Sequence, residues 1–154
     1  MTDAVPRSVV EAFYDAFVAR DEQMLEPFLH DDVVWTISGP VDILSYGGTH
    51  RGKVAVLDLI IRVVPSQFRA VHFVQESMLV EGNRVAMLNR RSARRAADGR
   101  VISYRVANFL RFHHGKVVEN LSLLDSFDAA EQLLGHSLAP HEPMSAVQGD
   151  LIAI

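Results

Sequence analysis

Two polar side chains in one largely apolar stretch, residues 101–125, could take part in proton transfer. Asn108 shares its strand face with apolar and aromatic residues, because side chains alternate along a strand. By the same alternation, Asp125 shares a face with Leu121 and Leu123. An amide in an apolar cavity can hold a ligand oxygen, and a carboxylate there can move a proton. We therefore predict catalytic roles for Asn108 and Asp125.

Each of these two residues also has a structural interpretation. A buried Asn108 could bond a neighbouring loop, since an unpaired buried amide costs roughly 1–3 kcal/mol. Asp125 precedes a predicted helix, and an aspartate at that position accepts hydrogen bonds from the first backbone N–H groups. The sequence leaves both interpretations open for both residues.

Four aromatic or imidazole side chains are expected to shape the pocket. Trp35 lies on a short predicted strand and could line the cavity or only pack in the core. Tyr46 and His50 lie on a glycine-containing segment, where they could face a ligand or solvent. Tyr104 lies on the same strand face as Asn108. We predict that all four contact the substrate.

His72 is a further candidate for substrate binding. It shares a strand face with Glu76, four residues away and therefore roughly 13 Å along the strand. That distance is too large for a shared metal ion unless other strands contribute ligands. We expect no metal site, and the turn at His113-His114 is expected to be solvated.

Several classes of function are disfavoured by the motifs that the sequence lacks and by its net charge. It has no glycine-rich phosphate loop, no cluster with metal-ligand spacing and no G-x-S-x-G motif, so we expect no cofactor and no serine hydrolysis. The net charge of −4 argues against a nucleic-acid partner. The RRSARR run at residues 90–95 is divided by alternation between two strand faces, and we expect it to form a solvated rim.

Hydrophobic periodicity predicts the elements that must position these residues. The predicted helices span residues 6–20, 22–29, 53–64 and 126–134, the third ending before Pro65. The predicted strands lie at 33–38, 70–80, 84–96 and, as a hairpin, within 101–125, with a loop at 41–52. This order predicts an α+β fold, a curved antiparallel sheet wrapped around helices as a cone-shaped barrel with a cavity at its mouth.

The bulk properties predict a single cytoplasmic domain. The chain of 154 residues contains no cysteine, which fits a reducing compartment. We find no signal segment and no apolar run long enough to cross a bilayer, so no membrane partner is expected. The domain should span residues 1–138, followed by a tail at 139–154 whose apolar end should dock on its own domain or on a second subunit.

Three stretches resemble a known family: VVEAFYDAFVARDEQMLEPFLHDDVVW, YGGTHRGKVAVLDLI and FLRFHHGKVVENLSLLDSFDAAEQLLG. They are similar to the SnoaL-like and ketosteroid-isomerase-related branch of the nuclear-transport-factor-two-like superfamily. The resemblance covers about residues 7–135 and implies a cone-shaped fold. That fold hosts isomerases, cyclases, hydrolases, dehydratases and non-catalytic binders. It also implies a homodimer formed through the open sheet face.

The resemblance transfers only part of each known active site. The tyrosine donor of ketosteroid isomerases matches Phe13, with Tyr14 adjacent, and we keep Tyr14 as a candidate substrate-binding residue. Their general-base aspartate matches Ile37 or Ser38, which cannot take a proton at neutral pH, and their second acidic donor matches Asn108. SnoaL-type cyclases have a His-Trp pair followed by an acid/base aspartate. Here the sequence has Asn120-Leu121 in place of that pair but keeps Asp125.

The leading hypothesis is a small-molecule-binding protein that catalyses cofactor-free proton transfer, of the isomerase, cyclase or dehydratase type. Its substrate would be an apolar compound with a carbonyl or hydroxyl group. The alternative is a non-catalytic ligand-binding or protein-interaction module of the same fold. A third hypothesis, epoxide hydrolysis, would have to use Arg90 or Arg105 together with Asp125.

Overall fold

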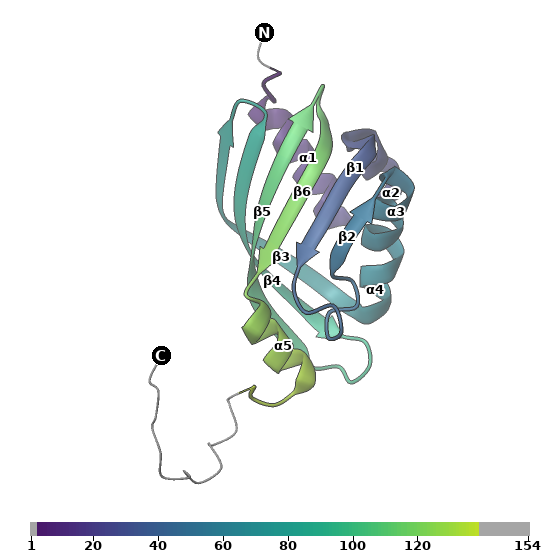
Figure 1. The fold of residues 1–154 in the computed structure, drawn as a ribbon, viewed down its shortest axis with the longest axis vertical. Helices are drawn as coiled ribbons and strands as arrows, with labels where there is room; N and C mark the ends of the chain where they lie inside the picture. The colour runs from purple at the N-terminus through teal and green to yellow at the C-terminus, as the bar shows by residue number, and fades with distance from the viewer. Residues whose placement is uncertain (1–2, 139–154) are drawn as a thin grey trace, which may run out of the picture.

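The computed structural model describes residues 3–138 of the chain (Figure 1). The predicted tail at 139–154, and the docking of its apolar end, lie outside these residues. The helical elements are α1 (Arg7–Ala19), α2 (Glu22–Leu25), the 3₁₀ turn η1 (Glu26–Phe28), α3 (Lys53–Asp58), the π-helix η2 (Leu59–Val63), α4 (Val64–Gln67) and α5 (Ser126–Leu134). The strands are β1 (Leu29–Ser38), β2 (Gly48–Arg51), β3 (Phe68–Glu81), β4 (Arg84–Arg95), β5 (Val101–His113) and β6 (Lys116–Leu124).

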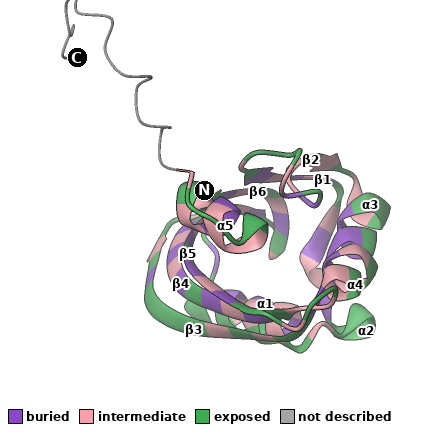
Figure 2. Ribbon diagram, turned by 90° about the horizontal axis from the view of Figure 1, so that it is seen from below, coloured by how far each residue is buried: buried purple, intermediate pink, exposed green. Residues whose placement is uncertain are grey.

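The strands form one curved sheet in the order β2-β1-β6-β5-β4-β3. Its neighbours are antiparallel except for β1 and β6, which run parallel. Figure 2 shows the sheet curving around the molecule, with α3 and α4 along its open side, and Figure 1 shows α5 at the lower end of the sheet. The predicted α+β fold, with its β3–β6 meander and helices on the concave face, is confirmed.

Alternation along the strands builds the core on the concave face. In β5 the inward face carries Ile102, Tyr104 and Phe112, which are almost fully buried. Phe13 of α1 packs edge-on against Phe112, with ring centroids 5.9 Å apart. Residues of the opposite parity, such as Phe109, lie on the exposed convex face. The strand pattern in the sequence therefore predicted which residues share a face.

The third predicted helix differs from expectation, because it does not end before Pro65. A π-turn, η2, carries the helical path on to Gln67. The N–H of Val64 bonds the carbonyl of Leu59, five residues back. Pro65 then lies in the first turn of α4, where a backbone N–H is not needed. The loop expected at 41–52 also contains the short strand β2.

No helix within residues 3–138 is long and apolar enough to cross a membrane.

Candidate ligand-binding site

A cavity of about 70 Å³ lies on the concave side of the sheet. Its wall is formed by side chains of α1, β1, the helical run from Leu59 to Val64, and strands β3–β6. The predicted pocket residues Trp35, Tyr46, Tyr104 and Asn108 all line it. Because the cavity holds only a few non-hydrogen atoms, a larger ligand has to displace part of its wall.

The apolar part of the wall is aromatic. Phe17 stacks on Trp35 with ring centroids 5.9 Å apart and an interplanar angle of 30°. Phe17 also contacts Phe73, at 5.5 Å. Trp35 is buried, whereas Phe17 and Phe73 are only partly buried. These two rings therefore form the less buried part of the aromatic wall.

The most unusual lining residue is Arg91, which is only 5% exposed. Its Nη1 donates a hydrogen bond to the Tyr104 hydroxyl, at 2.7 Å. The guanidinium group lies 4.6 Å from the ring centroid of Phe68, which fixes its plane by a cation–π contact. Among the described residues, its Nη2 has no hydrogen-bond partner. Arg91 is thus held in place by two contacts, with one donor group left over.

Arg91 corrects the expectation that the whole RRSARR run is a solvated rim. Within β4 it shares the inward face with Asn89 and Ala93, both almost fully buried. The neighbouring Arg90 is exposed and pairs with Glu76 on the convex face. Alternation places Arg91 on the same strand face as Val85 and the other inward-facing residues of β4. That shared face could have identified Arg91 from the sequence.

Two tyrosines extend the polar chain that begins at Arg91. The Tyr46 and Tyr104 hydroxyls lie 2.8 Å apart and are both buried. One of their two O–H protons makes the bond between them, and the Tyr104 oxygen also accepts from Arg91. One phenolic proton therefore remains to be donated elsewhere. Burial raises the pKa of Tyr46 well above its usual value, so this group is a donor and not a base at neutral pH.

A second arginine, Arg20, lines the same cavity from the C-terminal end of α1. Its Nη1 donates to the carbonyl of Ile60, at 2.7 Å. The π pattern of η2 would assign that carbonyl to the N–H of residue 65, which Pro65 lacks. Burial, and then the like charge of Arg91, lower the pKa of Arg20 to about 10. Arg20 remains charged at neutral pH.

Asn108 lies in a network of side-chain amides. Its Oδ1 accepts from Asn89, at 3.2 Å, and its Nδ2 donates to the Ser122 hydroxyl, at 2.8 Å, and to Asn120, at 3.3 Å. Tyr14 donates to the other side of Asn89, at 3.0 Å. Asn108 therefore bonds polar side chains on β4 and β6, and not a neighbouring loop. Tyr14 does not line this cavity and is linked to Asn108 through Asn89.

Asp125 lies outside the cavity. It follows the last residue of β6, whose Leu123 is 43% exposed on the convex face, and Asp125 is itself exposed. The expected burial of Asp125 is therefore wrong, because parity alone does not say which face is concave. Its carboxylate accepts from the N–H of Asp128, at 3.4 Å, and caps α5. The capping interpretation is confirmed.

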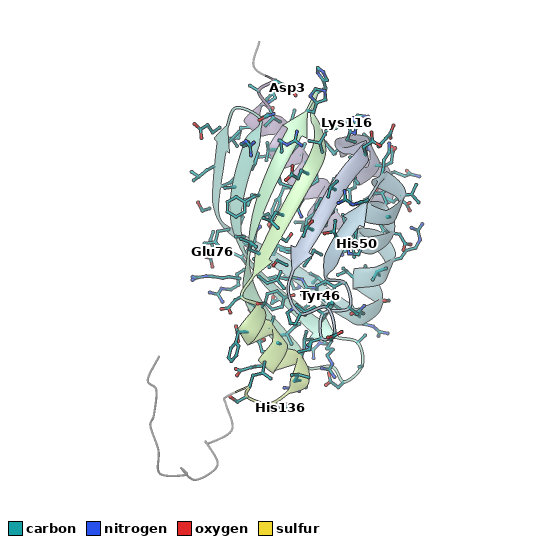
Figure 3. The ribbon with its side chains drawn as sticks, viewed as in Figure 1. Asp3, Tyr46, His50, Glu76, Lys116 and His136 are labelled. Carbon is teal, nitrogen blue, oxygen red and sulfur yellow. The ribbon has the colours of Figure 1, made fainter. Side chains whose placement is uncertain are left out.

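The two predicted histidines also lie away from the cavity wall. His50 is paired with Trp35 across β1 and β2, and its Nε2 lies 3.1 Å from the carbonyl oxygen of Tyr46 (Figure 3). It supports the backbone of Tyr46 without lining the cavity. His72 is exposed, near an irregularity in the β3–β4 register, and Phe73 takes the inward position beside it.

Comparisons with known proteins agree with this architecture. A family model described as a SnoaL-like domain matches residues 10–120. A candidate isomerase from Rhodopseudomonas palustris is 31% identical, with a TM-score of 0.72 over 82% of this chain and 93% of that one. A nuclear-transport-factor-two-like protein of unknown function from Burkholderia pseudomallei is 25% identical, with a TM-score of 0.73 over 82% of this chain and 95% of that one.

A candidate SnoaL-like polyketide cyclase from Shewanella denitrificans shares the fold at 16% identity, with a TM-score of 0.70 over 84% of this chain and 97% of that one. A search of curated proteins found no match. Because the SnoaL-like model covers most of the described domain, and a solved relative is 31% identical over nearly its whole length, the chain belongs to the SnoaL-like domain family.

Proposed function

We propose that the cavity binds a small, largely apolar molecule through a carbonyl or hydroxyl oxygen, and that the protein promotes cofactor-free proton transfer on it. The reaction would be of the isomerase, cyclase or dehydratase type. One observation carries this proposal: residues that line the cavity hold hydrogen-bond donors without an acceptor among the described residues, namely the buried Nη2 of Arg91 and one phenolic proton of the Tyr46–Tyr104 pair. Donors of this kind require an acceptor oxygen on the ligand.

These donors would act by stabilising charge on the ligand oxygen. When a proton leaves the carbon next to a carbonyl, negative charge develops on the oxygen, and fixed donors lower the barrier to that step. Arg91 and the tyrosine pair would bind the oxygen, while Phe17, Trp35 and Phe73 would contact the carbon skeleton. The names of the isomerase and cyclase relatives are consistent with this chemistry.

A second candidate function, a non-catalytic ligand carrier, is favoured by a specific observation. None of the described residues that line the cavity is an aspartate, glutamate or histidine. A general base within hydrogen-bond reach of the substrate is therefore missing from this wall. In a catalytic protein the proton acceptor would have to be water or the substrate itself.

Acetophenone distinguishes these two functions, because it has a flat ring, one carbonyl and exchangeable methyl protons. Its binding can be followed through the fluorescence of Trp35, the single tryptophan. Exchange of its methyl protons in D₂O can be followed by proton NMR. We expect wild-type protein to accelerate exchange, and the Tyr46→Phe/Tyr104→Phe double variant to lose about tenfold or more of that acceleration.

Single tyrosine variants are the internal control. Either tyrosine alone can still supply a phenolic proton to the ligand, so each single variant should retain more exchange activity than the double variant. Binding of acetophenone without any acceleration of exchange would support the carrier function and contradict the enzymatic one. Absence of binding would contradict both.

A further inference from the structure

The cavity contains two positive charges and no negative one among the described residues that line it. Arg20 and Arg91 are close enough that the charge of Arg91 makes the pKa of Arg20 fall. Neither appears among the ion pairs of the described residues, whereas the exposed Arg62, Arg90 and Arg105 all do. Charge taken out of water is destabilising unless an opposite charge compensates it.

Tyr46 does not supply that opposite charge. A phenolate beside Arg91 would balance one guanidinium, and Arg91 does favour ionisation of Tyr46. Burial and the neighbouring Tyr104 hydroxyl outweigh this effect and keep the Tyr46 pKa raised, so Tyr46 stays neutral at neutral pH. None of the described residues that line the cavity is an aspartate or a glutamate. A bound anion would supply the compensating charge.

We infer that the ligand is a small organic carboxylate with a flat apolar body, bound through its carboxylate by Nη2 of Arg91 and by Arg20. This inference rests on the proposed function and specifies its substrate class. Guanidinium groups suit carboxylates because their N–H groups match the two oxygens. Arg91 is preorganised for such a contact by its bond to Tyr104 and its packing on Phe68. The ring of the ligand would lie against the aromatic wall of Phe17 and Trp35.

Benzoate, benzamide and acetophenone test the inference, because they have nearly the same shape and only benzoate is charged. Dissociation constants would be measured at neutral pH by titration calorimetry and by Trp35 fluorescence. We expect wild-type protein to bind benzoate about tenfold or more tightly than benzamide. Arg91→Gln should lose about tenfold or more of the benzoate affinity and a clearly smaller factor of the benzamide affinity, because only benzoate loses an ionic contact.

Arg90→Gln is the matched control, since Arg90 precedes Arg91 on the same strand and is exposed on the convex face. It should leave both dissociation constants unchanged, which excludes a general effect of net charge. If Arg91→Gln does not fold, Arg20→Gln serves as the second variant and should lower benzoate affinity in the same direction. The wild-type comparison of benzoate with benzamide needs no variant at all.

The outcomes separate this inference from the proposed function. Equal binding of benzoate and benzamide by wild-type protein would overturn the carboxylate inference and leave the binding of a neutral carbonyl compound standing. Loss of benzoate binding in Arg90→Gln but not in Arg91→Gln would assign the charge preference to the surface and also overturn it. Binding of none of the three compounds would overturn the proposed function itself.

Discussion

Arg91 is positioned by contacts that fix its geometry without neutralising its charge. The Tyr104 hydroxyl and the Phe68 ring hold the guanidinium group, and neither carries a negative charge. Even a buried ion pair can often be replaced by apolar side chains of similar volume with a gain of about 1–4 kcal/mol in stability, so a buried charge without an opposite charge is costly. A buried charge that lowers stability and lies at a cavity wall is typical of a ligand-binding site, where function is kept at some loss of stability.

Asp125 provides a residue-scale prediction that separates capping from catalysis. Asp125→Ala should lower the free energy of unfolding by about 0.5–1 kcal/mol, because a helix N-cap is lost and its hydrogen bond is a long one. Asp125→Asn should cost less, since asparagine caps equally well. Urea denaturation measures the free energy of unfolding of both variants. In benzoate titrations, both variants should show the wild-type affinity. Reduced ligand binding or exchange activity in Asp125→Asn would restore the catalytic interpretation of this residue.

Alternation along a strand is a local property, so the sequence could show which residues share a strand face. It identified Asn108 as a polar group on an apolar face, and Tyr104 and Trp35 as cavity residues. It placed Asp125 on an apolar strand face, whereas this residue lies past the end of β6, is exposed and caps α5. Alternation says neither where a strand ends nor which face of the sheet is concave. Arg91 was missed since a run of arginines is usually solvated, and its aromatic partner Phe68 lies on another strand.

At the scale of elements, the amide network adds a hydrogen-bonded link to the aromatic contacts between α1 and the sheet. Tyr14 on α1, Asn89 on β4, Asn108 on β5 and Ser122 on β6 form a continuous hydrogen-bonded chain. Asn89 is 1% exposed, and Tyr14 is the only described donor to its Oδ1. A chain of buried polar groups stabilises a structure only when each member is satisfied. We therefore expect this network to contribute to holding α1 against the sheet.

Tyr14→Phe should lower the free energy of unfolding by about 1–3 kcal/mol, because it leaves the buried Oδ1 of Asn89 without a donor. In an Asn89→Leu background the same change should cost less than half as much, since no orphaned acceptor remains. Urea denaturation of the four proteins completes this double-mutant cycle. Equal costs in both backgrounds would show that Tyr14 contributes through packing alone.

The helical run that ends at Gln67 shows why element boundaries were harder to predict than element types. Pro65 was expected to stop the helix, and in a regular α-helix it would. Here a π-turn shifts the bonding pattern by one residue, and a side chain distant in sequence, Arg20, satisfies the carbonyl of Ile60. That compensation depends on the tertiary position of α1, so local sequence signals do not contain it.

At the scale of the whole molecule, the convex face of the sheet carries an apolar row across four strands. Leu79 pairs with Ala86, Ala86 with Phe109, and Phe109 with Leu121. Leu79 is 68% exposed and Phe109 is 48% exposed. The adjacent row is charged, and consists of Glu81, Arg84, Arg111 and Glu119. An apolar centre with a charged border of both signs is typical of a protein–protein interface.

We therefore expect the chain to form a homodimer through this face, so that sedimentation equilibrium gives a mass twice that of the 17.1 kDa chain. Phe109→Glu places a charge at the centre of the apolar row and should weaken dimerisation by about tenfold or more, since burial of an unpaired carboxylate is costly. Val54→Glu is the control, because Val54 is 83% exposed on α3, away from the row. Both variants should keep the cavity and bind benzoate as the wild type does. A wild-type protein that sediments at 17.1 kDa over the full concentration range would show that the convex face has another occupant or none.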